Sequence, residues 1–233
     1  MAKPEEAVEF LRTAVDADSN DRAQALEDLK FRYGDQWPLE IQNSRMLEAR
    51  PALTINETDA FLRKIENQQR QQRPRMNPHP TGSKASIETA KVLKGLCRHI
   101  EVNSDADNAY DLAFCFALTM GFGYFRMRTD YVREDSFDQD IYIDQVENPF
   151  AVYFDPNSTL PDGSDAKKVI VTDFVPRAAF KRQYPGAQET PFTALASGDP
   201  IPSWVQKESI RVAEYFHMTE RAATLVKLST GET

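Results

Sequence analysis

The sequence contains few of the residues that metal centres and disulfide frameworks need. The chain of 233 residues has two cysteines and three histidines. Two cysteines are too few for a disulfide framework, and the histidines lie too far apart for zinc-ligand spacing. The short motifs of phosphate-binding loops, dinucleotide folds, zinc peptidases and serine hydrolases are also missing. We therefore expect Cys97 and Cys115 to be buried thiols, and we predict a protein without catalytic residues, metal or cofactor.

Long hydrophobic runs are missing as well. No stretch of about 18 consecutive apolar residues occurs, so the sequence predicts no membrane-spanning helix and no membrane partner. The chain is nevertheless 41% hydrophobic, with 14 phenylalanines and 8 tyrosines. That content is too high for a chain that is disordered throughout, and the length suits one large domain or two small ones.

Charge is distributed unevenly along the chain, whose net charge is −8. Residues 61–101 hold nine basic and three acidic residues, whereas 1–60 hold seven and thirteen, and 102–170 hold five and thirteen. A nucleic-acid-binding domain usually has a basic balance as a whole, which this chain lacks. The alternation favours charge pairing within the fold or between subunits.

The basic run around residues 63–75 leaves two interpretations open. Its arginines could contact phosphate, but only Phe61 lies near enough in the sequence to stack on a base. We favour pairing of Arg70, Arg73 and Arg75 with carboxylates of the same chain or of a neighbouring subunit. We expect no tight binding of DNA by this segment.

The first half of the chain has helical periodicity. Helices are predicted at 4–15, from about 19 to 33 with Gly34 as the stop, and from 56 to shortly before Pro74. A fourth helix is predicted from Ser83 or Ser86 to about 100, and a fifth from a cap at 103–105 to Gly121. Residues 35–55 lack a clear period and are predicted to be a packed loop. The stripes of the last two helices are expected to form the core, with the residues Leu93, Cys97, Ile100, Tyr110, Phe114 and Phe116 or Ala117.

The second half changes to strand periodicity. Residues 124–133 alternate, with Phe125, Met127, Thr129 and Tyr131 on the side expected to be buried. Further strands are predicted at 141–146, 150–154, 168–175, 210–218 and 224–228, with a short helix at 177–184. A segment rich in proline, glycine and serine near 185–208 is expected to be flexible.

Together these segments predict an α+β fold in which N-terminal helices pack on a mainly antiparallel sheet. We divide the chain into 1–55 (helices and a packed loop), 56–121 (helical) and 122–233 (β-rich). The last residues, Thr-Gly-Glu-Thr, suit a hairpin turn but have no returning strand after them. We therefore expect the chain to be truncated within a hairpin and to be the N-terminal part of a longer protein.

Two groups of carboxylates are candidates for chemistry. Asp155, Asp162 and Asp165 lie in a turn-rich loop with Asn157 and Ser158, but the spacing fails the EF-hand pattern. This loop either hydrogen-bonds its own backbone or binds a metal in a hydrolase. The second group follows the 124–146 hairpin, where solvated edge charges are favoured over an acid–base pair; its members are Asp135, Asp138, Asp140 and Asp144.

Several motifs, taken in order, resemble a known family. They are 28–31 (Asp-Leu-Lys-Phe), 36–37 (Gln-Trp), 73–78 (Arg-Pro-Arg-Met-Asn-Pro), 120–123 (Met-Gly-Phe-Gly) and 210–216 (Ile-Arg-Val-Ala-Glu-Tyr-Phe). The most distinctive segment is 146–158 (Val-Glu-Asn-Pro-Phe-Ala-Val-Tyr-Phe-Asp-Pro-Asn-Ser), followed by Asp162 and by Ser-Asp-Ala at 164–166. From about Ala23 to its end, the chain resembles the N-terminal third of portal proteins of tailed bacteriophages of the short-tailed type.

The resemblance implies a structural protein of the virion, present in the host cytoplasm during assembly. It implies a ring of twelve subunits through which double-stranded DNA is packaged and ejected. Capsid, scaffolding, terminase and tail or head-completion proteins are the implied partners. The present segment resembles the peripheral wing, and the resemblance implies no particular contact residue.

Two alternatives to the portal function stay open. One is a metal-dependent hydrolase that uses the loop of Asp155, Asp162 and Asp165, and the other is an adaptor or scaffolding module of a virion. For a portal protein, we expect the complete chain to form a closed ring and this segment alone to be monomeric or weakly associated.

Overall fold

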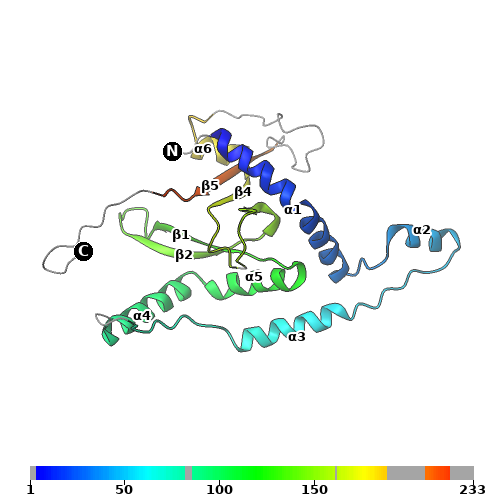
Figure 1. Cartoon of the computed structure of the whole chain (residues 1–233), viewed down its shortest axis with the longest axis horizontal. Coiled ribbons are helices and arrows are strands. Elements are labelled where there is room, and N and C mark those ends of the chain that lie inside the picture. Colours follow the sequence, from blue (N-terminus) through cyan, green and yellow to red (C-terminus); the bar gives the residue numbers. More distant parts are fainter. Residues whose placement is uncertain (1–3, 82–85, 161, 188–207, 221–233) are drawn as a thin grey trace. The chain divides into compact units, whose positions relative to one another are not determined.

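The structure is a computed structural model that describes residues 4–81, 86–160, 162–187 and 208–220. Figure 1 shows an α+β chain, as predicted. The helices are α1 (Pro4–Arg32), α2 (Leu39–Leu47), α3 (Thr58–Gln71), α4 (Ile87–Asn103), α5 (Ala106–Met120) and α6 (Arg177–Gln183). The strands are β1 (Phe125–Tyr131), β2 (Gln139–Gln145), β3 (Val152–Phe154), β4 (Lys168–Pro176) and β5 (Ser209–His217), with a 3-10 turn η1 (Pro149–Ala151) before β3.

The chain divides into two compact units, which are described separately. One unit comprises residues 1–18 and 151–233, and the other comprises residues 19–150. The first half of α1 therefore belongs to one unit and its second half to the other.

The unit of residues 1–18 and 151–233 is built on an antiparallel sheet in the order β3-β4-β5. Ile170 in the central strand pairs with Tyr153 on one side and Tyr215 on the other. The first half of α1 has apolar residues at helical spacing, and these cover the sheet. The resulting core contains Phe10, Leu11, Ala14, Val15, Tyr153 and Ile170.

The unit of residues 19–150 has a core between α5 and a two-stranded antiparallel hairpin. Ile143 of β2 is buried against Ala106 and Ala109 of α5. Small alanine side chains let this helix approach the strand closely. The chain between α5 and β1 is tight too, because a Cβ atom added at Gly123 would lie 1.9 Å from the backbone oxygen of Ala113.

Several predicted helix ends are confirmed at the level of single residues. The Ser86 hydroxyl caps α4 by accepting hydrogen bonds from the backbone N–H groups of Glu88 and Thr89. Gly34 and Gly121 follow α1 and α5 with positive φ angles of 100° and 85°. Strands β1, β2, β4 and β5 and helix α6 also lie where the sequence predicts them.

Two predictions about the N-terminal region are wrong. The helices expected at 4–15 and 19–33 are one continuous helix, α1. The capping residues Asp18, Ser19 and Asn20 do not interrupt it, because cap preference is weak and no glycine or proline stands there to break the backbone ladder. The packed loop expected at 35–55 contains α2, which has no buried residue.

Part of the predicted core is also wrong. Leu93 is 45% exposed and Ala117 is exposed, whereas Cys97, Phe114 and Phe116 are half-buried. Ile100 and Tyr110 do pack against the core of their unit. The C-terminal end of α4 is the part of this helix that packs against the β1–β2 hairpin. The earlier residues of its apolar stripe lie beyond the hairpin and keep their contact with solvent.

The face of β1 that the alternation predicted to be buried is exposed. Phe125, Met127 and Tyr131 are all exposed, and Thr129 is as well. Helices α4 and α5 contact mainly β2, so the side chains of β1 at the edge of this two-stranded sheet keep their contact with solvent. Phe125 packs against Tyr110, with 5.1 Å between the ring centroids.

Some predictions fall on residues that the structure does not describe. The strand expected at 224–228 and most of the segment expected to be flexible at 185–208 lie outside the described residues. Among the helices that are described, none has the length and apolar content needed to cross a membrane.

Candidate functional site

The acidic loop after β3 is the first candidate site. Each of its three carboxylates accepts hydrogen bonds from the loop itself. Asp155 accepts from the backbone and side-chain nitrogens of Asn157 at 3.0 and 2.9 Å, and Asp162 accepts from the Ser164 hydroxyl at 3.0 Å. The carboxylates therefore hold the shape of the loop, in agreement with the self-bonding interpretation.

Asp165 is the central acceptor of this loop. It accepts from the Ser158 hydroxyl at 2.6 Å, from the Thr159 backbone N–H at 2.7 Å and from the Thr159 hydroxyl at 3.0 Å. The hydrogen bond from Ser158 and those from Thr159 hold the pKa of the Asp165 carboxyl well below its ordinary value. A carboxylate so occupied is a poor proton donor or acceptor for catalysis.

Hydrogen bonds from the loop also occupy the Asp155 carboxylate. For Asp155, partial burial opposes ionisation, but hydrogen bonds from Asn157 and from the Lys167 backbone outweigh it and lower the pKa of the carboxyl. Within the described ranges, no three acidic, histidine or cysteine side chains are close enough together to hold a metal ion.

The basic run is the second candidate, and its arginines are largely paired within the chain. Arg70 lies 3.1 Å from Asp111, and Arg73 lies 2.7 Å from the same carboxylate. Arg73 also forms an ion pair with Asp107. The prediction of pairing is thus confirmed for Arg70 and Arg73, whereas Arg75 has no ion-pair partner among the residues that the structure describes.

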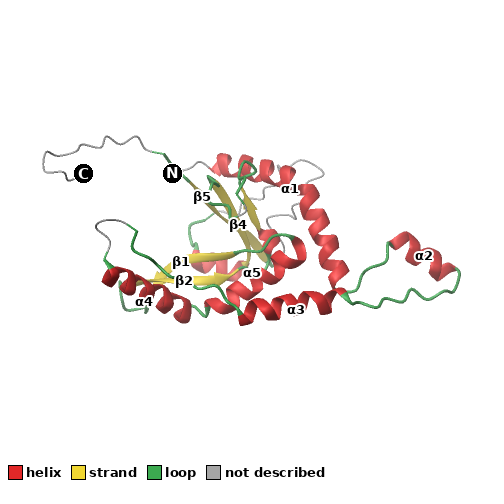
Figure 2. Cartoon of the chain, turned by 60° about the horizontal axis from the view of Figure 1, so that its bottom comes forward, coloured by secondary structure: helices red, strands yellow, loops and turns green. Residues whose placement is uncertain are grey.

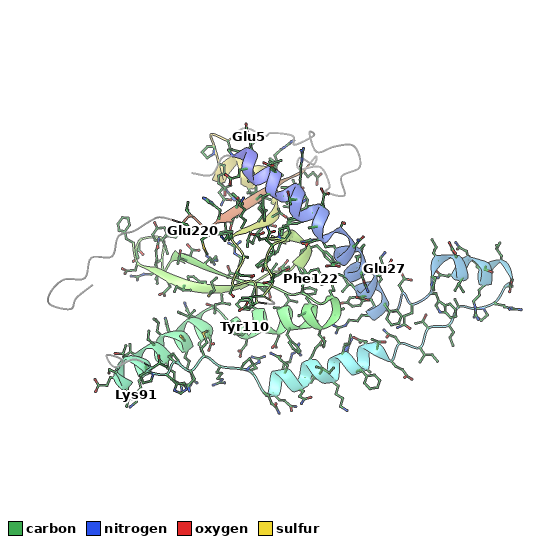
Figure 3. The ribbon with its side chains drawn as sticks, in the orientation of Figure 1. Glu5, Glu27, Lys91, Tyr110, Phe122 and Glu220 are labelled. Carbon is green, nitrogen blue, oxygen red and sulfur yellow. The ribbon has the colours of Figure 1, made fainter. Side chains whose placement is uncertain are left out.

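Arg75 borders an open groove of about 490 Å³ between the 73–77 segment, α4 and α5. The basic Lys94 and Arg98 line it together with the acidic Glu101, Asp105 and Asp107. Tyr110 of α5, labelled in Figure 3, also lines it. A groove of mixed charge is not the continuous basic track that a nucleic-acid backbone requires.

The carboxylates of the hairpin do not form an acid–base pair. Asp144 is bonded to Arg128, which also pairs with Asp130, and Asp138 accepts from the Ser136 hydroxyl at 3.1 Å. Asp135 is exposed and lies 3.7 Å from Arg133. Asp135 and Asp138 are exposed, as the sequence favoured, whereas Asp144 is half-buried and paired with Arg128.

A buried cluster around Arg32 is the feature that the sequence analysis missed. The guanidinium of Arg32, at the end of α1, lies 2.7 Å from Glu66 of α3 and 3.3 Å from Asp59. It also donates hydrogen bonds to Cys115 and Thr119 of α5. One signal could have revealed it: Glu66 stands four residues after Leu62, and therefore on the same face of the helix as that apolar side chain.

Contacts within the Arg32 cluster shift the pKa values of Arg32 and Cys115. Burial disfavours the charged guanidinium, but hydrogen bonding to Glu66 outweighs that cost and raises the pKa of Arg32. Burial raises the pKa of the Cys115 thiol, and a hydrogen bond with Glu66 raises it further. A thiol in this state is a weak nucleophile, so the cluster stabilises the helices and does not resemble a catalytic cysteine site.

The described residues form helices and two antiparallel sheets. The carboxylates and arginines of the candidate sites make hydrogen bonds and ion pairs that stabilise these elements and their loops. Comparison with known proteins agrees with that picture. The family described as phage P22-like portal protein matches residues 8–233. The chain therefore belongs to the P22-like portal protein family of bacteriophages, and the match begins earlier than the resemblance at Ala23 had indicated.

A curated relative gives the same result. The chain is 26% identical over 225 residues to a protein named portal protein from Acyrthosiphon pisum secondary endosymbiont phage 1. The alignment covers 91% of this chain and 31% of the relative. The chain thus spans about a third of the length of the curated relative that it matches.

Proposed function

We propose that this chain forms the wing part of a portal subunit, in a ring at one vertex of the phage capsid. The observation that carries the proposal is the family match over residues 8–233. The α+β architecture of the described residues supports it. The ring has twelve subunits, by the resemblance of the sequence to short-tailed phage portals.

The ring would serve as the passage for double-stranded DNA during packaging and ejection. Its partners would be capsid and scaffolding proteins, the terminase motor, and tail or head-completion proteins, with the virion as its final location. The division at about residues 55 and 121 would separate an N-terminal helical part, a helical wing part and a β-rich wing part.

Deletion of the gene in its own phage tests this function. The expected result is that capsids form without packaged DNA, and that the wild-type gene supplied in trans restores filled heads. An Asp135→Asn variant, changed at an exposed ion pair with Arg133, should restore them equally well. Normal yields of filled heads in the deletion mutant would contradict the proposal.

A further inference from the structure

The segment 34–57, here called the arm, carries large apolar side chains that the described residues of its unit leave exposed. Their exposed fractions run from 46% for Ile41 to 90% for Leu47. The set consists of Leu39, Ile41, Met46, Leu47, Leu53 and Ile55. Scattered apolar residues are normal on a surface, but a concentration of this kind indicates an interaction site.

The arm is held in a defined shape by polar contacts at its base and along its length. The Asn56 side chain donates to the Arg32 backbone oxygen at 2.6 Å and accepts from Gln36 at 3.1 Å. Arg45 lies over the Trp37 ring at 4.6 Å and donates to the Pro51 oxygen at 3.0 Å. These bonds present the apolar side chains outward, so their burial requires another surface.

A second uncovered apolar surface lies on α4. Val92, Leu93 and Leu96 share one helix face by their spacing and are 45–70% exposed. We call these three residues the α4 stripe. Figures 1 and 2 show α2 and α4 at opposite ends of their unit, with α3 and α5 between them.

The two surfaces are complementary in charge. The arm holds four carboxylates and two arginines. Among the described residues, Asp35, Glu40 and Glu57 of the arm have no ion-pair partner, and neither do the basic side chains that flank the α4 stripe. Those basic residues are Lys91, Lys94 and Arg98, and Figure 3 labels Lys91.

We propose that the arm of one subunit packs on the α4 stripe of the next copy of the same chain. This inference rests on the proposed ring function and names the surfaces that meet within it. A head-to-tail contact requires two different surfaces on each subunit, and such a contact closes into a ring when its rotation allows. Arm-to-arm pairing in a two-fold dimer would instead place like charges opposite each other.

Zero-length carbodiimide cross-linking tests the contact directly on the complete protein that carries these 233 residues. Subunits with natural and heavy nitrogen isotopes are mixed before assembly, so that cross-links between copies are recognised by mass spectrometry. We expect amide links from Asp35, Glu40 or Glu57 to Lys91 or Lys94 in mixed-isotope pairs. Mixed-isotope links from the arm to other elements alone would overturn the proposal.

Substitutions test the apolar part of the contact. Leu47→Asp and Leu96→Asp are each expected to raise the protein concentration needed for half-assembly by about tenfold or more. Phe137→Asp is the matched control, because Phe137 is 96% exposed at the tip of the β1–β2 hairpin and lies outside both surfaces. Far-UV circular dichroism of each variant checks that the subunits stay folded.

The outcomes separate this inference from the proposed function. Rings that form equally well with Leu47→Asp and Leu96→Asp would overturn the arm contact while leaving the portal function in place. A wild-type protein that forms no ring would overturn the proposed function. A double variant, Glu40→Lys with Lys94→Glu, is expected to assemble better than either single variant, since it restores opposite charges.

Discussion

Arg32 is a single side chain that joins three helices. Its guanidinium reaches Glu66 and Asp59 on the α3 side and Cys115 and Thr119 on α5. A charge with 8% of its side chain exposed is stable only while these partners remain, because a buried unpaired ion is costly.

Replacing Glu66 with alanine should therefore destabilise the unit strongly. We expect a loss of about 3 kcal/mol in the free energy of unfolding, at the lower end for a broken buried pair, because Asp59 still faces the guanidinium. Urea denaturation measures it. Glu48→Ala, at an exposed pair with Arg50, is the control and should change the value by less than about 0.5 kcal/mol.

Asp165 gives a prediction about pH. Its pKa in the folded protein lies below the ordinary value of 3.8, so the folded state binds fewer protons than the unfolded chain between those two values. The stabilisation that ionised Asp165 provides is thus complete above that ordinary value and declines as the pH falls below it.

The difference in unfolding free energy between the wild type and Asp165→Asn should be constant near neutral pH and should shrink below about pH 4. Urea denaturation at several pH values measures this difference. Ser158→Ala should raise the pKa of Asp165 in an NMR titration, because it removes the shortest hydrogen bond to the carboxylate. A difference that grows on acidification would contradict the assignment.

At the scale of secondary-structure elements, we expect substitutions in α4 and in β2 to differ in their effect on the free energy of unfolding. Leu93 of α4 is 45% exposed, so Leu93→Ala should cost less than about 1 kcal/mol in unfolding free energy. Ile143 of β2 is 2% exposed against α5, so Ile143→Ala should cost about 2–5 kcal/mol. Equal effects of the two substitutions in thermal or urea unfolding would show that the core is placed wrongly.

The basic run gives a second prediction at this scale. Because Arg70 and Arg73 are paired with Asp111, we expect no submicromolar binding of duplex DNA at moderate salt by the segment 63–75. A fluorescence anisotropy titration tests this with the wild type and an Arg70→Gln, Arg73→Gln variant. Tight binding that disappears in the variant would reverse the interpretation.

The sequence predicts most elements because their periodicity is local. The alternation around β1 and β2 and the Ser86 cap of α4 are set by neighbouring residues, and both are found where expected. The break predicted at residues 18–20 of α1 is wrong because it is based on a local capping preference. The helical preference of the residues on both sides outweighs that capping preference.

Burial is harder to predict from the sequence, since it depends on which elements meet. The stripe of α4 and the apolar face of β1 have patterns typical of core, but too few helices lie over them. Glu66 presents the opposite case, in which a charged residue is buried because a distant arginine pairs with it. For the acidic loop, by contrast, local turn chemistry sufficed to favour self-bonding over metal binding.

For the whole molecule, exposed apolar surface and ring formation are linked. The arm and the α4 stripe leave a subunit with two surfaces that gain stability by burial. Light scattering across a concentration series should show an increase in mass for the complete protein. Leu47→Asp should shift that increase to higher concentration, whereas Phe137→Asp should leave it in place.

The most direct test of the portal function is electron microscopy of the purified complete protein. Two-dimensional class averages should show closed rings with a central channel and twelve-fold rotational symmetry, as the resemblance implies. The central channel should be wide enough to admit a DNA duplex. Particles that are only monomers, two-fold dimers or open filaments would contradict the assignment of this chain to a portal ring.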